Sequence, residues 1–393
     1  MESGHTPSRR HPEYWGGSIP WVSIRDAKAG HGKTLKTTDE QTNEMGILNS
    51  SARVLPAGTV CLSRTASVGY VTVLGQPMAT SQDFVSWVCG PGLEPDFLKH
   101  LLIAEGKDLL RFASGSVHQT IYFPEAKAFH VCLPDRSEQQ RIVAILDEAF
   151  AGIATANANA EKNLRNCREW AERQLATVLD EASKTEEART LDSLVAPSCS
   201  LSYGIVQPGD EVATGLPVVR PVDLGSKIVR VDGLKRIDPA LARSYARTTL
   251  EGGDLLLCVR GTTGKVAVAA LALAGANVTR GIVPIRFDPK FISQALGYYL
   301  LRSAPFQIQI RAKTYGTALM QINIGDLRKI VVRIPPISHQ ATVVAQLNAV
   351  QEAADQLADI YERKLAALDE LKKSLLHQAF TGALAGSASG GAE

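Results

Sequence analysis

The sequence has little of what marks a membrane, metal-binding or secreted protein. No apolar run approaches the roughly 18 residues that a membrane-spanning helix needs, and the start MESGHTPSRRHPEYWGG lacks the apolar core of a signal peptide. The six cysteines are scattered without a CxxC pair, and the eight histidines show no paired spacing with acids or cysteines. We therefore expect a cytoplasmic protein without a metal site, in which most cysteines are small core residues.

Three local patterns resemble catalytic motifs, but each lacks the context that its chemistry needs. AKAGHGKT (27–34) ends like a phosphate-binding loop, yet Ala27 stands where that loop requires glycine. A nuclease-like set (Pro95, Asp96, Glu105 and Lys107) lies among leucines with helical spacing. Methyl transfer would need a glycine-rich cofactor loop and a catalytic Pro-Pro-aromatic loop, but the Pro335–Pro336 pair is flanked by isoleucines. We expect no catalytic, cofactor-binding or metal-binding residue in this chain.

Composition and charge point to a folded protein with a polyanionic partner. With 393 residues, 45% hydrophobic and 21% charged, the chain predicts two or three globular units. Residues 186–334 hold 19 basic and 12 acidic residues, a net charge of +7, whereas residues 134–185 and 335–393 carry −2 and −3. A basic globular segment between acidic ones favours a partner such as nucleic acid, although chance clustering of charges on solvated faces would look the same.

The two halves of the chain repeat each other at a spacing near 200 residues. IPWVSIRD (19–26) matches LPVVRPVD (216–223), and GTVCLSRTASVG (58–69) matches GDLLLCVRGTTG (253–264). The longest pair closes each half: LPDRSEQQRIVAILDEA (133–149) and IPPISHQATVVAQLNAV (334–350). The chain is therefore predicted to be a duplication of one structural unit.

Each repeat ends in a long predicted helix whose apolar residues recur at three and four positions. We expect Ser137 and Ser338 to cap these helices, and the two seams, which share one extra four-residue step, to pair antiparallel as a coiled coil. Such a pair would hold the two globular domains apart at a fixed spacing. The alternative is that each helix folds back on its own domain. The predicted seam residues are Ile142, Leu146, Ile153, Leu164, Val343, Leu347, Leu357, Leu365 and Leu368.

The globular parts have the pattern of mixed α/β domains. Short apolar strands at 68–74, 84–88, 254–259 and 282–287 alternate with turns, and one helix is expected after Pro95 and one after Pro289. The predicted organisation is two tandem α/β domains separated by two long antiparallel helices. Its boundaries are 1–133 for the first domain, 134–185 for the central helix, 186–334 for the second domain, 335–384 for the C-terminal helix and 385–393 for a flexible tail.

These segments resemble the specificity subunits of type I restriction-modification systems. The resemblance rests on the opening YWGGSIPWVSIRDA, the helix starts LPDRSEQQRIVAILD and IPPISHQATVVAQL, and the ending SLLHQAFTGAL, in this order over nearly the whole chain. It implies that each domain is a target-recognition domain that reads one half of a bipartite site in double-stranded DNA. The helices would set the gap between the two halves.

The resemblance also implies which partners carry the chemistry. Adenine methylation would belong to two modification subunits that bind S-adenosylmethionine, docked on the helix faces of 137–182 and 338–380 that the seam leaves free. ATP- and magnesium-dependent cleavage would belong to restriction subunits, so the chain itself would be a non-catalytic subunit without cofactors. In one respect the repeat is unequal. The segment TLDSLVAPSCSLSYG (190–204) of the second half has no counterpart before Gly4 in the first half. This pattern is typical of a truncated or misassigned start, which would remove one strand from the first domain.

The candidate DNA-binding residues lie in two polar loops of each domain, because base reading needs forked donors and acceptors and phosphate contacts need cations and hydroxyls. In the first domain they are Arg64, Thr65, Ser67, Ser114, Ser116, His118 and Gln119, and in the second Arg260, Thr262, Thr263, Lys265, Lys313, Thr314, Tyr315, Thr317 and Gln321, with Arg280 and Arg311 as phosphate contacts. Arg260 is taken as the counterpart of Arg64. A protein-interaction scaffold without DNA specificity is the alternative function, and salt-dependent binding to duplex DNA would separate the two.

Overall fold

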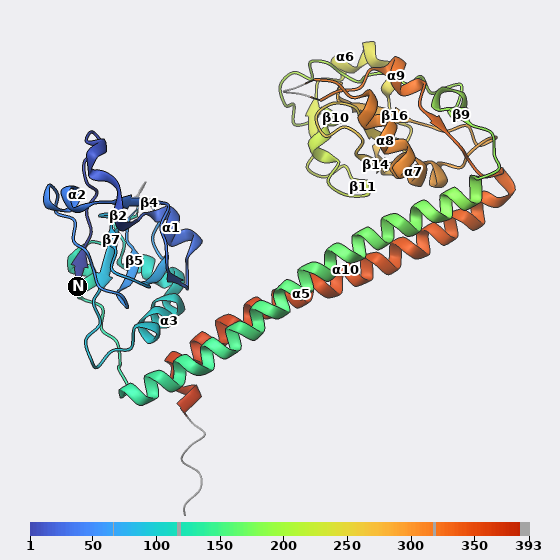
Figure 1. Cartoon of the computed structure of the whole chain (residues 1–393). Coiled ribbons are helices and arrows are strands. Elements are labelled where there is room, and N and C mark those ends of the chain that lie inside the picture. Colours follow the sequence, from blue (N-terminus) through green and yellow to red (C-terminus); the bar gives the residue numbers. More distant parts are fainter. Residues whose placement is uncertain (66, 116–118, 317–319, 386–393) are drawn as a thin grey trace, which may run out of the picture. The chain divides into compact units, whose positions relative to one another are not determined.

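The chain divides into two compact units, each with a mixed α/β domain, as the sequence predicted. The computed structural model describes residues 1–65, 67–115, 119–316 and 320–385 (Figure 1). Unit 1 comprises residues 1–161 and 363–393, and unit 2 comprises residues 162–362. The long helices α5 (Arg136–Ser183) and α10 (Ile337–Phe380) each contribute to both units. In the part of the chain that is described, no helix is long and apolar enough to cross a bilayer.

Unit 1 contains two small sheets, with strand orders β1-β8-β5-β6-β3 and β4-β2-β7. Helix α3 packs on β5 and β6, where every residue of both strands is buried. The strands are β1 (Glu2–Ser3), β2 (Trp15–Val22), β3 (Thr34–Leu35), β4 (Glu40–Thr42), β5 (Val60–Ser63), β6 (Val71–Leu74), β7 (Ala79–Thr80) and β8 (Phe84–Trp87). The shorter helices are α1 (Ile24–Ala29), α2 (Glu44–Leu48), α3 (Pro95–Glu105), the 3-10 helix η2 (Gly106–Phe112) and α4 (Phe123–Lys127).

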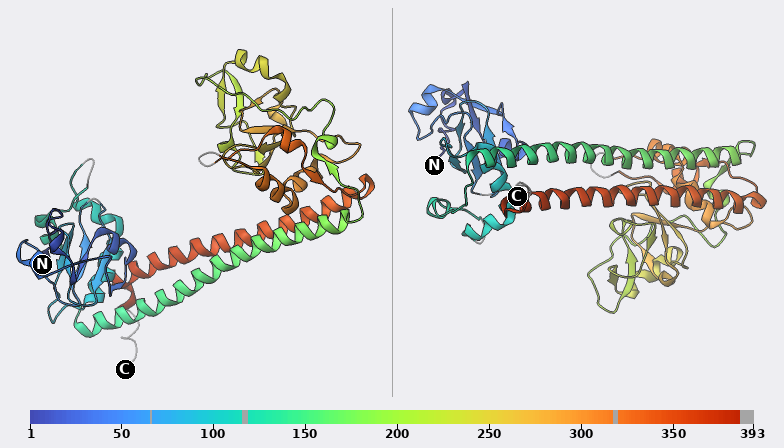
Figure 2. Two further views of the ribbon diagram at one scale, coloured as in Figure 1. Left: turned by 45° about the horizontal axis from the view of Figure 1, so that its top comes forward. Right: turned by 90° about the horizontal axis from the view of Figure 1, so that it is seen from below.

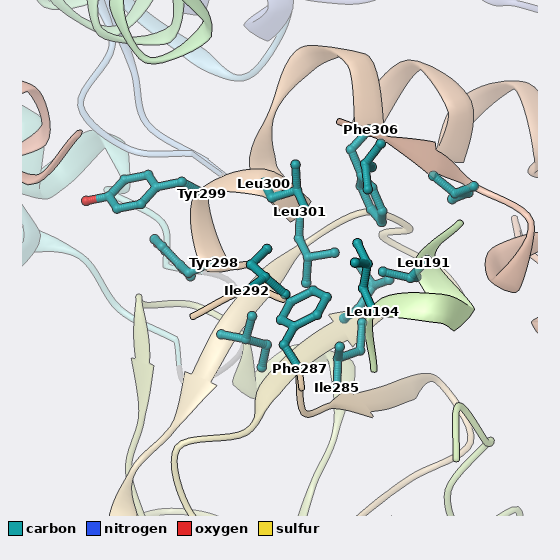
Figure 3. Close-up of a cluster of buried hydrophobic side chains, with 14 of the residues drawn as sticks. Leu191, Leu194, Ile285, Phe287, Ile292, Tyr298, Tyr299, Leu300, Leu301 and Phe306 are labelled. Atoms are coloured by element: carbon teal, nitrogen blue, oxygen red, sulfur yellow. The ribbon is translucent and has the colours of Figure 1, made fainter. Parts of the chain in front are cut away.

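Unit 2 is built in the same way, with strand orders β12-β10-β15 and β11-β14-β13-β16 and a further pair, β17-β9. Its strands are β9 (Arg189–Thr190), β10 (Leu216–Val219), β11 (Ile228–Val229), β12 (Lys235–Ile237), β13 (Leu255–Cys258), β14 (Val266–Ala269), β15 (Asn277–Val278), β16 (Ile282–Ile285) and β17 (Val331–Val332). Its shorter helices are the 3-10 helices η3 (Leu191–Leu194), η4 (Pro221–Asp223), η5 (Arg243–Thr248) and η6 (Leu271–Leu273), and α6 (Pro239–Ala242), α7 (Gln294–Arg302), α8 (Ala304–Lys313) and α9 (Ile324–Arg328). Side chains of η3, β16, α7 and α8 meet in the core that Figure 3 shows.

Strand pairing repeats the sequence duplication. In unit 1, β2 pairs antiparallel with β4 and parallel with β7, and in unit 2, β10 pairs antiparallel with β12 and parallel with β15. Central strands β5 and β13 are each flanked by two antiparallel neighbours. The same local motif follows β2 and β10. The Asp26 carboxylate accepts a hydrogen bond from the Ser23 backbone N–H, and the Asp223 carboxylate accepts one from the Arg220 backbone N–H.

Two glycines identify the start of the repeated core. A Cβ on Gly4 would lie 2.2 Å from the Thr80 carbonyl oxygen, and one on Gly204 would lie 2.0 Å from that of Val278, so no side chain fits at either position. The next residue donates its N–H to the same carbonyl in both units, at 2.9 Å from His5 and 2.8 Å from Ile205. Gly4 is therefore the structural counterpart of Gly204.

The start of each long helix is fixed to its domain by one glutamine. Gln139 is fully buried; its Oε1 accepts from the Glu94 N–H at 2.8 Å, and its Nε2 donates to the carbonyls of Gly92 and Pro134. Gln340 makes the same bonds to the Ser293 N–H and to the carbonyls of Phe291 and Pro335. Each glutamine thus satisfies three buried backbone groups, which ties the direction of the helix to the domain.

Within each unit α5 and α10 lie side by side and run antiparallel (Figures 1 and 2). In unit 1, Ile142 and Leu146 pack with Leu376 and Ala379, and in unit 2, Leu179 packs with Val343 and Leu347. Of the predicted seam, Ile142, Leu146, Ile153, Val343 and Leu347 are buried, and Leu164, Leu365 and Leu368 are half-buried.

Two local expectations were wrong. Leu357 is 39% exposed. After the buried Ala354, the next residue of α10 that faces inward is the half-buried Ala358, so the step is four residues where three were expected. The cap of α5 is Asp135, whose Oδ1 accepts from the Glu138 N–H at 2.8 Å and from the Ser137 hydroxyl. The helix expected after Pro289 is present as α7, which begins at Gln294 with the Ser293 side chain as its cap.

Candidate nucleic-acid interface

The structure brings the two predicted polar loops of each domain together through backbone hydrogen bonds. In unit 2, the Gly261 N–H donates to the Met320 carbonyl at 2.8 Å and the Ile322 N–H donates to that of Val259 at 3.0 Å. In unit 1, the Ile121 N–H donates to the Arg64 carbonyl at 2.8 Å. Each second loop is closed by a pair of bonds at 2.9 Å, between Ser114 and Thr120 and between Tyr315 and Gln321. Both loops therefore belong to one surface in each unit.

Arg64 and Arg260 are not counterparts, which corrects the pairing of these two arginines but agrees with the ungapped alignment of 58–69 on 253–264. The N–H of Arg64 donates to Asp83, and its carbonyl accepts from Ile121; in unit 2 the residue with both of these bonds is Val259, one position before Arg260. The Arg64 guanidinium donates to the carbonyls of Gln82 at 2.9 Å and Ile121 at 3.4 Å. Burial lowers its pKa, with the Asp83 carboxylate acting in the opposite direction. Arg64 thus holds the two loops together from inside.

The other candidates of unit 1 divide into structural and exposed groups. The Thr65 hydroxyl donates to Asp83 at 2.5 Å, and the carbonyl of Ser67 accepts from the Ser63 hydroxyl. Ser114 and Gln119 are exposed, so their side chains are available to a ligand. Ser116 and His118 lie outside the described residues.

In unit 2, a cluster of polar and cationic groups surrounds Tyr203. The Arg280 guanidinium lies 6.0 Å from the centre of its ring, and the Tyr203 hydroxyl donates to the Ile322 carbonyl at 3.0 Å. Burial raises the pKa of this hydroxyl, and the charges of Arg280 and Arg260 oppose that shift. Beside it, Gln321 donates to the Tyr315 hydroxyl, which donates to Asn323. This Tyr203 cluster holds amide and guanidinium donors in one place.

Other candidates of unit 2 line a separate pocket of about 470 Å³. Lys265 and Arg311 meet there with Lys227 and Arg302, which the sequence did not single out. The rings of Tyr298 and Tyr299 form its wall, with the Lys227 ammonium 5.2 Å from the first ring centre. Four cations against the carboxylate of Glu172 make this cationic pocket a place for an anion such as phosphate.

The remaining candidates contribute less. The Thr314 hydroxyl donates to the Ile310 carbonyl at 2.6 Å and so ends α8. Lys313, the last residue of α8, is half-buried; on the first loop Thr262 is exposed and Thr263 is half-buried. Thr317 lies outside the described residues. In the part of the chain that the structure describes, no group of three or more metal-ligating side chains is present.

The architecture is that of a duplicated α/β protein with two long helices, and comparisons with known proteins show what it is similar to. Residues 1–164 match the family model "Type I restriction modification DNA specificity domain". The EcoBI specificity subunit of a type I restriction enzyme from Escherichia coli is 25% identical over 194 residues, 49% of this chain and 41% of that protein. The resemblance predicted from the sequence is confirmed.

Solved structures share the fold over nearly the whole chain. A chain from a study of complex assembly and conformational transition of the type I R-M system has a TM-score of 0.75 at 18% identity, covering 97% of this chain and 95% of that one. The HsdS subunit from Thermoanaerobacter tengcongensis has a TM-score of 0.57 at 18% identity, covering 97% and 94%. By sequence, the chain spans about two fifths of the length of the curated relatives that it matches first.

Proposed function

We propose that the chain is the sequence-specific DNA-recognition subunit of a type I restriction-modification complex. Each domain, 1–133 and 186–334, would read one half of a bipartite site in double-stranded DNA. The observation that carries this proposal is the repeated surface of paired polar loops in two domains of one fold, the first of which matches the DNA specificity family. The net charge of +7 on residues 186–334 supports a polyanionic ligand.

Base reading and phosphate binding would fall to different groups of unit 2. The Tyr203 cluster offers Gln321 and the guanidinium of Arg260, whose Nε is buried without a hydrogen-bond acceptor among the described residues. Amide and guanidinium forks are the groups that discriminate adenine and guanine in the major groove. The cationic pocket would hold a backbone phosphate and so fix the position of the domain along the duplex.

Catalysis would lie on partner subunits in the same cytoplasmic complex. Two modification subunits carrying S-adenosylmethionine would methylate adenine, and restriction subunits using ATP and magnesium would cleave. The exposed faces of α5 and α10 would dock the modification subunits. This chain would contribute the choice of site alone.

A methylation map tests the proposal directly. DNA from cells that produce this chain with a modification subunit should carry methyladenine at a two-part motif with a fixed gap, and cells lacking only this chain should not. If both proteins copurify and no such motif appears, the protein-scaffold function is favoured instead.

Arg260→Ala is expected to weaken binding of the methyltransferase complex to its duplex site by about 1–3 kcal/mol, or roughly fivefold to 150-fold, without lowering the stability of the chain. The reason is that the Nη groups of Arg64 donate to the Gln82 and Ile121 carbonyls, whereas no such hydrogen bond of the Arg260 guanidinium is present among the described residues. Arg64→Ala is the matched comparison and should destabilise unit 1. Titrations at several salt concentrations together with thermal unfolding would measure both effects, and unchanged affinity of Arg260→Ala would remove this residue from the interface.

A further inference from the structure

Three side chains of unit 2 form a row across the two joined loops. Arg260 and Gln321 are a bridged antiparallel pair, and the backbone hydrogen bonds that join them lie on either side of the pair, at 2.8 and 3.0 Å. In a pair of this kind the Cα atoms are about 4.5 Å apart and both side chains stand on the same face of the ladder. Tyr315 pairs with Gln321 from the other side through two bonds at 2.9 Å. Gln321 is therefore the middle of a row that runs from Arg260 to Tyr315.

Hydrogen bonds at one end of the row fix the orientation of the Gln321 amide. The Tyr315 hydroxyl has a single proton, which it donates to the Asn323 Oδ1 at 2.5 Å, so toward Gln321 it can only accept. The Gln321 Nε2 donates to it at 3.1 Å. The nitrogen of the amide is thereby held on the Tyr315 side. Among the described residues no further hydrogen bond of this side chain is present, so Oε1 and the second Nε2 proton are open to a ligand.

Unit 1 shows that the fold does not require these long side chains. By the backbone hydrogen bonds that the two units share, Thr120 and Thr65 are the counterparts of Gln321 and Arg260. The same ladder is thus built in unit 1 with short hydroxyl side chains. In unit 2 the Nε of Arg260 is buried without a hydrogen-bond acceptor in the described part of the chain. The amide and the guanidinium therefore serve a ligand rather than the joining of the loops.

Resting on the proposed function, we propose that this row reads two neighbouring purines in the half-site of unit 2, adenine through Gln321 and guanine through Arg260. The Gln321 Oε1 accepts from the N6 amino group of adenine and its Nε2 donates to N7, and the Arg260 guanidinium donates to O6 and N7 of guanine. Base pairs are about 3.4 Å apart along the duplex, close to the separation of the two residues in the ladder, so the two side chains reach neighbouring pairs. Tyr315 is a positioning residue, because it holds the amide without touching the base.

The test starts from the motif that the methylation map of the wild-type chain gives. Synthetic duplexes carry this motif with each position of both half-sites changed in turn to the other three bases, and anisotropy measures binding of the purified complex of the chain with its modification subunit. At one adenine the wild-type preference should be about fivefold to 150-fold, and Gln321→Leu should bind all four duplexes within about threefold of one another. Arg260→Ala should lose a guanine preference in the same way, at the neighbouring position of the same half-site.

A duplex with 7-deazaadenine at that position tests the contact on the unaltered protein. This analogue keeps its base pairing but has a C–H group in place of N7, so it removes only the acceptor of the Gln321 Nε2. The wild-type complex should bind it about twofold to tenfold more weakly than the adenine duplex, and Gln321→Leu should not distinguish the two. Tyr315→Phe, which keeps the amide but frees its orientation, should lower the adenine preference by a smaller factor than Gln321→Leu.

Lys265→Ala is the control, because this lysine belongs to the cationic pocket of the same unit. It should lower the affinity for every duplex by one common factor, since a phosphate contact carries no sequence information. Thermal unfolding of each variant checks that unit 2 is folded.

Four results would overturn the proposal. They are an unchanged base preference of Gln321→Leu, equal binding of adenine and 7-deazaadenine by the wild-type complex, affected positions of Gln321→Leu and Arg260→Ala that are not neighbours, and a Lys265→Ala variant that loses the same base preference. In each case the two-part motif of the wild-type chain would still stand. The absence of any such motif would instead refute the proposed function, so the two failures are distinguishable.

Discussion

Replacing Asp254 with alanine is expected to destabilise unit 2 by about 3–5 kcal/mol, a large part of the stability of an ordinary domain. Asp254 is 0% exposed. Its Oδ2 accepts from the N–H groups of Glu251 and Gly252 at 2.7 and 3.1 Å, and its Oδ1 lies 2.5 Å from the Nε of Arg286. Alanine would leave the Nε of the mostly buried Arg286 and two backbone donors without their acceptor, while the guanidinium keeps its contacts with Glu251 and the Thr249 carbonyl.

Asp192→Ala is the control for this experiment. Asp192 also faces an arginine of unit 2, Arg328, at 3.4 Å, but both side chains are substantially exposed. Water and salt screen such a pair, so this variant should lose at most about 1 kcal/mol. Urea unfolding followed by circular dichroism, with limited proteolysis to locate the unfolded unit, measures both. Equal stability of the two variants would refute a structural role for the buried pair.

Lengthening both long helices by one heptad is expected to lengthen the gap of the methylated motif by about three base pairs. Seven residues would be inserted between Glu161 and Lys162 and seven between Glu362 and Arg363. Seven helical residues add roughly 10.5 Å, and base pairs are about 3.4 Å apart. A heptad in each helix preserves the three-four spacing of the seam, which an insertion in one helix alone would break.

The gap is measured on a methylation map of DNA from cells that produce the lengthened chain. The two half-site sequences should stay the same while the gap changes. The same heptad added after Glu393 is the control and should leave the gap unchanged. Methylation that persists at the original gap in the lengthened chain would show that the helices do not set the spacing.

The duplicated fold could be predicted from the sequence because the residues that position its elements are themselves repeated. Proline, serine and glutamine recur at the two helix starts, and Gln139 and Gln340 make the same three bonds. The strand-turn loops keep their glycines at equal spacing, and the structure joins these loops to the second polar loops. Strand bounds were predicted to within a few residues, since buried runs such as Leu255–Cys258 are continuous and apolar.

The candidate site was less accessible to sequence reasoning. Tyr203 precedes Arg260 and Gln321 by more than fifty residues, and only strand pairing in the folded domain brings it near them. Lys227 and Arg302 are on separate loops and helices and meet Lys265 only in three dimensions. Arg64 looked like the partner of Arg260 because the residue types agree, but the backbone bonds place Val259 there, as the ungapped alignment of 58–69 on 253–264 also does.

The matching hydrogen bonds of Gln139 and Gln340 also bear on how recombination could change such a protein. In each half, one glutamine in the first turn of α5 or α10 ties the helix to the loop before α3 or α7, and both halves of the chain use the same bonds. A recombination event that exchanged the coding sequence between these positions would place a new domain where the glutamine contacts with the helix already fit. Specificity of one half could then change in a single step, with the other half and the helices left as they were.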